Sequence, residues 1–233
     1  MNGVKLEQFR RIPTDVLKQS RLPDGRDSLK ARPDGTVLDG HHRLFVLRER
    51  GEDINLLPPS DHGERSVTPH MFPIPGPWRG RLAISARPRG GDWLEDEVRG
   101  WRRAGIDTVV SLLEPEEASE LGLDAESAAA DAHGIRFVPF PIADRSVPDS
   151  PGTAVRLLRD LNYALESGDS IAIHCRQGIG RSALIAAGLL VAAGVDPGSA
   201  IRTVAAARGL AVPETAEQRR WIEELANHLV ATG

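Results

Sequence analysis

Cysteine and long apolar runs are scarce in this chain and a net positive charge is absent, and each of these features excludes a class of protein. A single cysteine among 233 residues excludes an internal disulfide framework and agrees with a reducing cytoplasm. The formal net charge of -4 leaves no basic footprint for binding nucleic acid with the main part of the chain. No apolar run is long enough to span a membrane, and the first residues lack the apolar core of a secretory signal. The sequence therefore predicts a soluble, cytoplasmic protein without membrane partners.

The distribution of proline divides the chain into three parts. Six prolines fall within residues 58–77, and proline at that density supplies neither helix nor ladder donors, so we expect an extended connector there. The sequence leaves open whether this connector is flexible or packs on its neighbour through apolar residues. We expect a small unit at residues 1–57 and a main domain at residues 78–233. A hydrophobic content of 40% is enough for a real core in the main domain.

Short apolar strands alternate with helical segments throughout the main domain. We expect strands at 81–85, 106–113, 135–140 and 170–173, and helices at 116–121, 124–133, 154–166, 183–193, 197–209 and 214–230. This alternation predicts an α/β fold with a mainly parallel central sheet flanked by helices. Ligands of such sheets bind at the carboxyl ends of the strands. The small unit, with a strand at 37–38 and a helix at 43–50, is expected to be an α+β appendage.

The only cysteine lies between a buried strand and a buried helix. Residues 170–173 are a short apolar run, and residues 183–193 are almost wholly Ala, Leu, Ile and Val. The loop between them, Arg176-Gln177-Gly178-Ile179-Gly180-Arg181, can direct successive backbone N–H groups at one point beside a helix N-terminus. Arg181 adds a planar fork of donors that matches two phosphate oxygens. The segment therefore predicts a phosphate-binding loop.

The same surroundings predict a reactive thiol. Helix N-termini and nearby cations favour the thiolate form of cysteine, which is the nucleophile. Cys175 would attack a phosphorus atom held by the loop and form a phospho-cysteine, which water then hydrolyses. We expect Ser182 to hydrogen-bond the sulfur and ease its departure. The alternative is a buried structural cysteine beside a tight turn.

These residues carry a family resemblance. The fixed positions of the motif are His174, Cys175, Gly178, Arg181 and Ser182. In this pattern the chain resembles the cysteine-based protein tyrosine phosphatases, and most closely their dual-specificity, kinase-associated-phosphatase-like group, over about residues 78–233. The resemblance implies a hydrolase that needs no metal or cofactor and acts on a phosphorylated protein or another phosphomonoester.

A proline-bounded loop at residues 139–149 is expected to carry the general acid. Such a loop has no ladder to hold it and can place a carboxylate over a pocket. Asp144 and Asp149 compete for this role. Similar phosphatases place the acid in a Pro-x-x-Asp pattern, which Pro141-Ile142-Ala143-Asp144 reproduces. We therefore prefer Asp144, and we expect Asp149 to cap the helix that follows Pro151.

Two further residues are assigned supporting roles. The resemblance implies a glutamine near the start of the last helix that orients the hydrolytic water, and Gln218 is the candidate. His174 is next to Cys175, but adjacent strand side chains point to opposite faces. We therefore expect His174 to be a buried support for the loop rather than a base.

The small unit contains a second, shorter motif. Asp39-Gly40-His41-His42-Arg43 resembles the Gly-x-x-Arg element of ParB-like and sulfiredoxin-like folds, which binds phosphates at a helix start. This resemblance implies an anion site at Gly40, His41, His42 and Arg43, with nucleotide or nucleic-acid binding left open. A structural or partner-docking appendage is the alternative. Two readings of the whole protein also stay open: a catalytically weak phospho-binding adaptor, and a protein whose functional centre is this unit.

Overall fold

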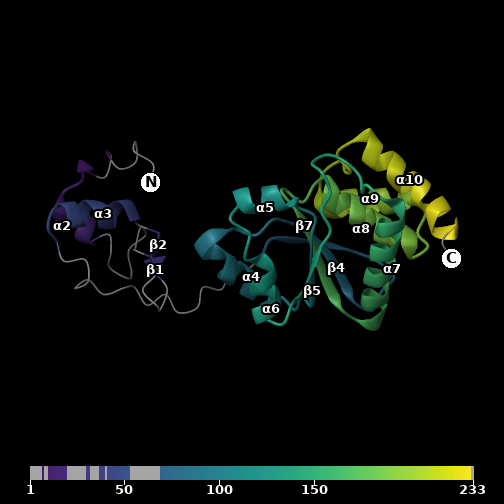
Figure 1. Ribbon diagram of the computed structural model, residues 1–233, viewed down its shortest axis with the longest axis horizontal. Helices are drawn as coiled ribbons and strands as arrows, with labels where there is room; N and C mark the ends of the chain where they lie inside the picture. Colours follow the sequence, from purple (N-terminus) through teal and green to yellow (C-terminus); the bar gives the residue numbers. More distant parts are fainter. Residues whose placement is uncertain are drawn as a thin grey trace. The chain divides into compact units, whose positions relative to one another are not determined.

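The computed structural model describes residues 7, 10–19, 30–31, 37–39, 41–52 and 69–231. It covers the backbone alone at residues 19, 30–31, 37–39, 41–43, 92, 226, 228, 230 and 231. The chain divides into two compact units, Met1–Ser66 and Val67–Gly233 (Figure 1). No helix in these described ranges is both long enough and apolar enough to cross a membrane.

The first unit is a pair of helices with a small hairpin. It contains α2 (Thr14–Gln19), β1 (Lys30–Ala31), β2 (Val37–Asp39) and α3 (His41–Glu49), and β1 pairs with β2 in antiparallel register. The strand and the helix expected at 37–38 and 43–50 are confirmed by β2 and α3. Leu17, Val46 and Leu47 form its buried cluster. A cluster of this size gives a small core, as expected for so short a unit.

The anion site expected in the first unit lies outside the described part of the structure. Gly40 and the side chains of His41, His42 and Arg43 are not described. The backbone of α3 begins at His41, so the motif does stand at a helix start. Anion binding there stays a prediction.

The second unit is built on a five-stranded sheet. Its strands are β3 (Met71–Ile74), β4 (Arg81–Ala86), β5 (Thr108–Ser111), β6 (Arg136–Pro139) and β7 (Ser170–Cys175). They lie in the order β3-β4-β7-β5-β6. All neighbours are parallel except the edge pair β3 and β4. The predicted mainly parallel α/β sheet is therefore confirmed, and β7 lies at its centre.

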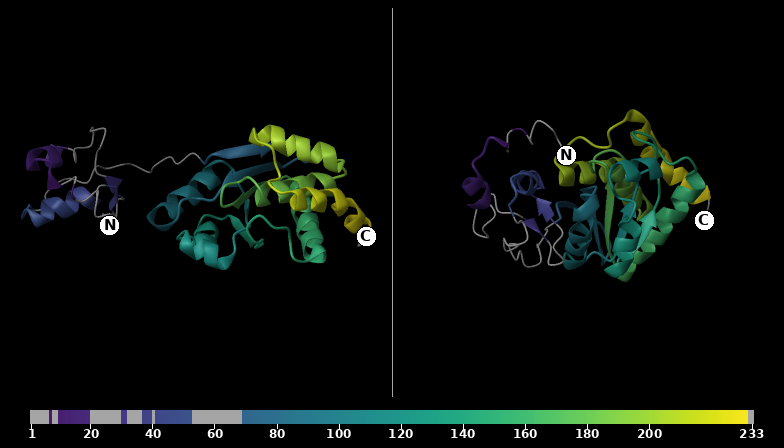
Figure 2. Two further views of the ribbon diagram at one scale, coloured as in Figure 1. Left: turned by 90° about the horizontal axis from the view of Figure 1, so that it is seen from above. Right: turned by 60° about the vertical axis from the view of Figure 1, so that its left-hand side comes forward.

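Helices cover both faces of this sheet (Figures 1 and 2). They are the 3-10 helix η1 (Gly91–Trp93), α4 (Leu94–Arg103), α5 (Pro115–Glu120), α6 (Glu126–Ala132), α7 (Pro151–Ser167), α8 (Arg181–Ala192), α9 (Pro197–Arg208) and α10 (Ala216–Ala231). Helices α7 and α8 pack on one face together with α9 and α10, and α4 and α6 pack on the other.

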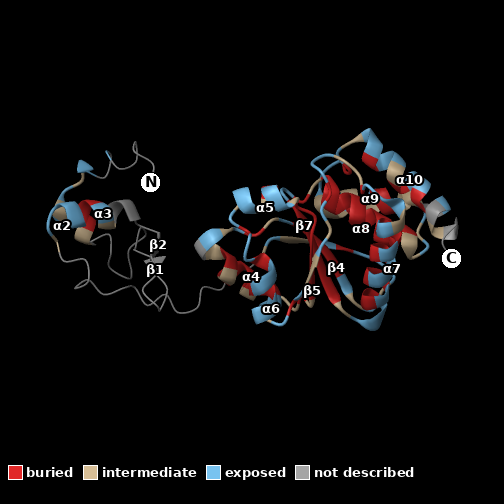
Figure 3. Ribbon diagram, viewed as in Figure 1, coloured by how far each residue is buried: buried red, intermediate tan, exposed pale blue. Residues whose placement is uncertain are grey.

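The central strand β7 shows why both faces need a helix layer. Ile171 and Ile173 belong to the cluster under α7 and α8, whereas Ala172 belongs to the cluster under α4 and α6. Side chains alternate between the faces of a strand, so a strand covered on both sides is apolar at every position. All residues of β7 are buried, as Figure 3 shows for the centre of the sheet. Its carboxyl end delivers Cys175.

The edge strand β3 corrects the sequence prediction for the connector. Residues 71–74 lie within the proline-rich segment, yet Met71 pairs with Ser85 and Ile74 with Leu82. An edge strand needs ladder donors on one side only, so it tolerates Pro73. Phe72 and Ile74 pack against the main core. The expectation that a connector runs to residue 77 is therefore wrong over 71–74, and residues 58–68 are not described.

The start of α7 corrects a second expectation. The N-cap of this helix is Ser150, whose Oγ accepts a hydrogen bond from the Thr153 amide at 3.4 Å. Thr153 Oγ1 donates in turn to the Ser150 carbonyl at 2.8 Å. Asp149 was expected to be the cap. Proline occupies the first helical position, and the cap is the residue directly before it, which is Ser150.

Candidate active site

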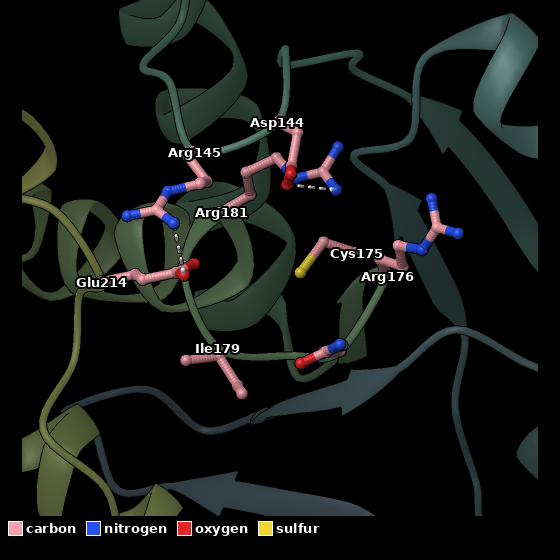
Figure 4. A pocket seen from close by; sticks show the side chains of 9 residues that line it. Asp144, Arg145, Cys175, Arg176, Ile179, Arg181 and Glu214 are labelled. Carbon is pink, nitrogen blue, oxygen red and sulfur yellow. Dashed lines mark ion pairs between the residues drawn. The ribbon is translucent and has the colours of Figure 1, made fainter.

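A cavity of about 180 Å³ opens at the carboxyl end of β7 (Figure 4). Its lining residues are Asp144, Arg145, Cys175, Arg176, Gln177, Ile179, Gly180, Arg181 and Glu214. Cys175 ends β7 and Arg181 begins α8, so the predicted strand, loop and helix are all present. The structure thus brings the predicted nucleophile, phosphate ligand and acid to one cavity.

The conformation of the loop depends on Gly178. Its φ angle of +66° lies in the left-handed region, which glycine adopts without a steric penalty. A Cβ at this position would be only 2.4 Å from the Ser85 carbonyl oxygen. The loop can therefore pack directly against the end of β4 only with glycine here.

Arg208 holds the loop from the side away from the cavity. Its guanidinium donates to the carbonyl oxygens of Gly178 at 2.8 Å and Gln177 at 3.3 Å, and it stacks on the Phe72 ring at 3.9 Å. In a trans peptide the C=O and the following N–H point in opposite directions. The N–H groups of Gly178 and Ile179 therefore point away from Arg208, which is the orientation a phosphate cradle requires.

Arg181 is buried and fixed by a carboxylate. Its Nη1 and Nη2 atoms donate to the two oxygens of Glu117 at 2.7 and 2.9 Å. Nη1 also donates to the Ile142 carbonyl at 3.0 Å. The hydrogen bonds from Arg181 hold the pKa of Glu117 below its ordinary value. Burial opposes the charge of Arg181, but Glu117 and the nearby Cys175 outweigh burial and raise the guanidinium pKa. Arg181 is thus a permanent cation at the cavity wall.

The structure separates the two acid candidates. Asp144 lines the cavity, and its Oδ1 lies 3.3 Å from Arg181 Nη2. Its side chain is 68% exposed, so it is accessible to a leaving group. The following residue, Arg145, has a φ of +62°, which turns the chain sharply at the cavity mouth. Asp149 is exposed and is not among the lining residues.

Gln218 lies behind the loop rather than in the cavity. Its side chain is fully buried, and its oxygen accepts from the amides of Glu214 at 3.1 Å and Thr215 at 3.3 Å. Its Nε2 donates to the Ser146 carbonyl at 3.0 Å. Gln218 therefore ties the loop that carries Asp144 to the start of α10. A role in orienting water stays a prediction.

The remaining motif residues are buried under the loop. Ser182 Oγ has no hydrogen-bond partner among the described residues, so the expected hydrogen bond to the sulfur is not formed in this structure. His174 is fully buried, and its Nε2 lies 2.9 Å from Glu126 Oε1. The two atoms are in contact, but the geometry is not that of a hydrogen bond. His174 also stacks on Trp101 at 5.8 Å.

Other loop residues line the mouth of the cavity. Figure 4 shows the Arg176 side chain extending away from the Cys175 sulfur, and Arg176 Nη1 lies 3.6 Å from Glu117. Glu214 enters from the opposite side and lies 3.8 Å from Arg145. The mouth therefore carries charges of both signs, and the cation that is withdrawn from solvent is Arg181.

Sequence reasoning missed four charged residues of this site: Glu117, Glu126, Arg208 and Glu214. Each comes from an element distant in sequence from the loop. Only Glu117 could have been found from the sequence. An arginine buried at a helix start needs a carboxylate partner, and residues 114–117 follow β5, the strand beside β7. The other three belong to helices or loops whose placement depends on tertiary packing.

Comparison with known proteins places this geometry in a class. Residues 85–195 match the family model described as "Polymorphic toxin system, DSP-PTPase phosphatase". The rat cyclin-dependent kinase inhibitor 3 is 32% identical over 140 residues, which are 59% of this chain and 66% of that protein. The human protein of the same name is 32% identical over 100 residues, which are 42% of this chain and 47% of that protein. The chain thus spans less than two thirds of the length of each of these two relatives.

Solved structures agree with this class. The crystal structure of kinase associated phosphatase, with its catalytic-site cysteine changed to serine, aligns with a TM-score of 0.66 at 22% identity, over 71% of this chain and 98% of that chain. That similarity supports the fold. The active form of Tk-PTP aligns with a TM-score of 0.53 at 29% identity, over 64% of this chain and 92% of that chain. The fold and the loop are similar to those of cysteine-based phosphatases. Over residues 85–195 the chain is similar to the dual-specificity phosphatase family.

Proposed function

We propose that this protein hydrolyses phosphomonoesters of proteins, foremost phosphotyrosine, through a phospho-cysteine intermediate. The observation that carries the proposal is the cavity in which Cys175, Arg181 and Asp144 meet. A substrate phosphate would sit in the loop with its oxygens on the backbone N–H groups and on Arg181. This arrangement stabilises the negative charge that spreads over the phosphoryl group during transfer.

The proposed reaction has two steps. In the first, the Cys175 thiolate attacks phosphorus, the bond to the ester oxygen breaks, and Asp144 gives its proton to the leaving alkoxide or phenoxide. In the second, water attacks the phospho-cysteine, a proton returns to Asp144, and the thiolate leaves as inorganic phosphate forms. Both steps use side chains of this chain and consume only the ester and one water molecule.

The direct test is turnover of a small aryl phosphate by purified protein in the presence of EDTA. We expect hydrolysis with the unmodified protein and none with Cys175→Ser, because serine is a far weaker nucleophile at neutral pH. The Cys175→Ser protein should still bind phosphate, since the loop and Arg181 are unchanged. Full activity of Cys175→Ser contradicts the mechanism.

The same assay separates the proposal from the adaptor alternative. A protein that binds phosphorylated partners without turnover would retain a phosphopeptide yet release no phosphate. Asp144 stands against this alternative, because a pure binding site has no use for an accessible carboxylate 3.3 Å from the phosphate-binding arginine. Binding of aryl phosphate without hydrolysis would establish the adaptor instead.

A further inference from the structure

A second cavity lies beside the candidate active site. It measures about 210 Å³. Its lining residues are Pro69, His70, Ser85, Ala86, Arg87, Pro88, Arg89, Glu97 and Trp101. The cavity thus opens at the carboxyl end of β4, which is the edge of the sheet where such folds bind their ligands. The proposed reaction makes no use of it.

The charged groups around this cavity favour an anion. Two guanidinium groups, those of Arg87 and Arg89, line it with one carboxylate, that of Glu97, and this carboxylate forms an ion pair with Arg89. Arg89 also stacks on the Trp93 ring at 4.0 Å, which holds its guanidinium in place. Arg87 donates only to the Pro88 carbonyl, at 3.0 Å, and has no acidic partner within the described ranges. One cationic side chain is therefore left uncompensated.

A buried hydroxyl gives a second, independent indication of a ligand. Ser85 is 3% exposed and lines the cavity, and its Oγ has no hydrogen-bond partner in the described part of the chain. Buried hydroxyls in folded proteins are almost always hydrogen-bonded. A bound oxyanion would accept the Ser85 hydrogen and the Arg87 donors together.

The two cavities are separated by a thin wall of backbone. Ala86 is the register partner of Cys175 on the adjacent parallel strand, and neighbouring strands lie about 4.8 Å apart. Gly178 packs against the Ser85 carbonyl. Gln177, which directly precedes Gly178, lines the candidate active-site cavity. A single peptide that places a phosphorylated side chain in one cavity can therefore reach the other within a few residues.

We propose that this second cavity, through Arg87, Arg89 and Ser85, binds another anionic group of the same phosphopeptide substrate. That group would be an acidic side chain or a second phosphorylated residue. The inference rests on the proposed function, since it names the substrate class that the catalytic site favours. The enzyme would then prefer phosphorylated residues in acidic surroundings over isolated ones.

The test compares three substrates: a phosphotyrosine peptide with acidic flanking residues, the same peptide with Gln and Asn in their place, and a small aryl phosphate. The unmodified protein should show the highest kcat/KM on the acidic peptide, and this preference should weaken as ionic strength rises. Arg87→Gln should lower kcat/KM for the acidic peptide about tenfold, because one charge-assisted hydrogen bond to the peptide is lost. Its kcat/KM for the other two substrates should stay unchanged.

Arg79→Gln is the matched control. Arg79 is exposed and precedes β4 at its opposite end, so this variant loses the same charge far from the cavity. It should keep the preference for the acidic peptide. The inference is overturned if the unmodified protein has equal kcat/KM for the two peptides. It is also overturned if Arg79→Gln loses as much kcat/KM on the acidic peptide as Arg87→Gln does. A stronger preference for inositol polyphosphates than for the acidic peptide overturns the assignment to peptides. Failure to hydrolyse the aryl phosphate points instead to failure of the proposed function.

Discussion

Arg181 carries a positive charge almost without solvent contact, and Glu117 is the residue that makes this stable. A buried guanidinium costs desolvation energy unless a carboxylate with good geometry compensates for it. The two oxygens of Glu117 match the two nitrogens of Arg181 at 2.7 and 2.9 Å. This fork holds Arg181, the proposed phosphate-binding residue, in place before any substrate arrives, so the proposed site is preorganised.

We expect Glu117→Gln to lower the free energy of unfolding by about 3 kcal/mol, because breaking one side of a buried pair leaves the other charge uncompensated. Glu116→Gln, on the exposed side of the same helix turn, is the control and should change little. Urea unfolding measures both. A Glu117→Gln protein as stable as the control contradicts this view of Arg181.

The pH dependence of this effect follows from the lowered pKa of Glu117. A depressed carboxyl pKa contributes stability that is complete above the unfolded value of about 4.5 and is lost as pH falls through the lower folded value. The stability difference between the unmodified protein and Glu117→Gln should therefore be constant near neutral pH. It should shrink as the solution is acidified below 4.5.

Asp144 can be tested by varying the leaving group. Asp144→Asn should lower kcat by about 10² to 10⁴ on an alkyl or tyrosyl phosphate, since a positioned acid contributes that much. The loss should be smaller for an activated aryl phosphate, whose leaving oxygen needs no proton. Asp149→Asn is the control and should leave kcat unchanged. If Asp149→Asn causes the loss instead, the assignment of the acid is wrong.

At the scale of elements, the phosphate loop is shaped by contacts from outside it. Arg208 at the end of α9 binds two loop carbonyls, and Phe72 of β3 stacks on the same guanidinium. The edge strand and a distant helix thus meet at the loop. The loop's own sequence provides the glycines, whereas its neighbours select one of the conformations that those glycines allow.

We expect Arg208→Gln to weaken phosphate binding and to lower kcat/KM about tenfold, because two hydrogen bonds that orient the loop are lost. Arg202→Gln, at an exposed position on the same helix, is the control. Vanadate that binds in the loop should shield the Cys175 thiol from an alkylating reagent. The degree of shielding therefore reports the order of the loop without turnover. Unchanged protection in Arg208→Gln contradicts a positioning role.

Elements that are contiguous in the sequence could be predicted, whereas contacts between distant elements could not. β7, the loop and α8 follow one another within 170–192, and local apolarity and glycine placement define all three. Glu117, Glu126 and Arg208 reach the site through tertiary packing, which no local pattern encodes. β3 was missed because Pro73 and the prolines around the strand argue against it, and only its place at the sheet edge makes Pro73 tolerable.

At the scale of the whole molecule, each unit has a core of its own. Leu17, Val46 and Leu47 pack together in the first unit, and none of them belongs to the clusters of the second unit. The lining residues that the structure describes for the candidate active-site cavity all belong to the second unit. We therefore expect the chemistry that we propose to proceed without the small unit.

Two truncations test this independence and the position of the boundary. A chain that begins at Val67 should hydrolyse a small aryl phosphate as well as the full chain does. A chain that begins at Trp78 lacks β3, and with it Phe72 and the buried Ile74. We expect it to lose about 3 kcal/mol or more of stability and much of its activity. Equal behaviour of the two truncations contradicts a structural role for β3.

The most direct test of the central claim is to find where the phosphoryl group resides during turnover. Protein mixed with a radiolabelled aryl phosphate, denatured within the first turnover and digested, should carry the label on the peptide that contains Cys175. The Cys175→Ser protein should carry none. The phospho-cysteine mechanism would be contradicted if the protein hydrolysed the substrate steadily without acquiring label, or if the label were found on any other residue.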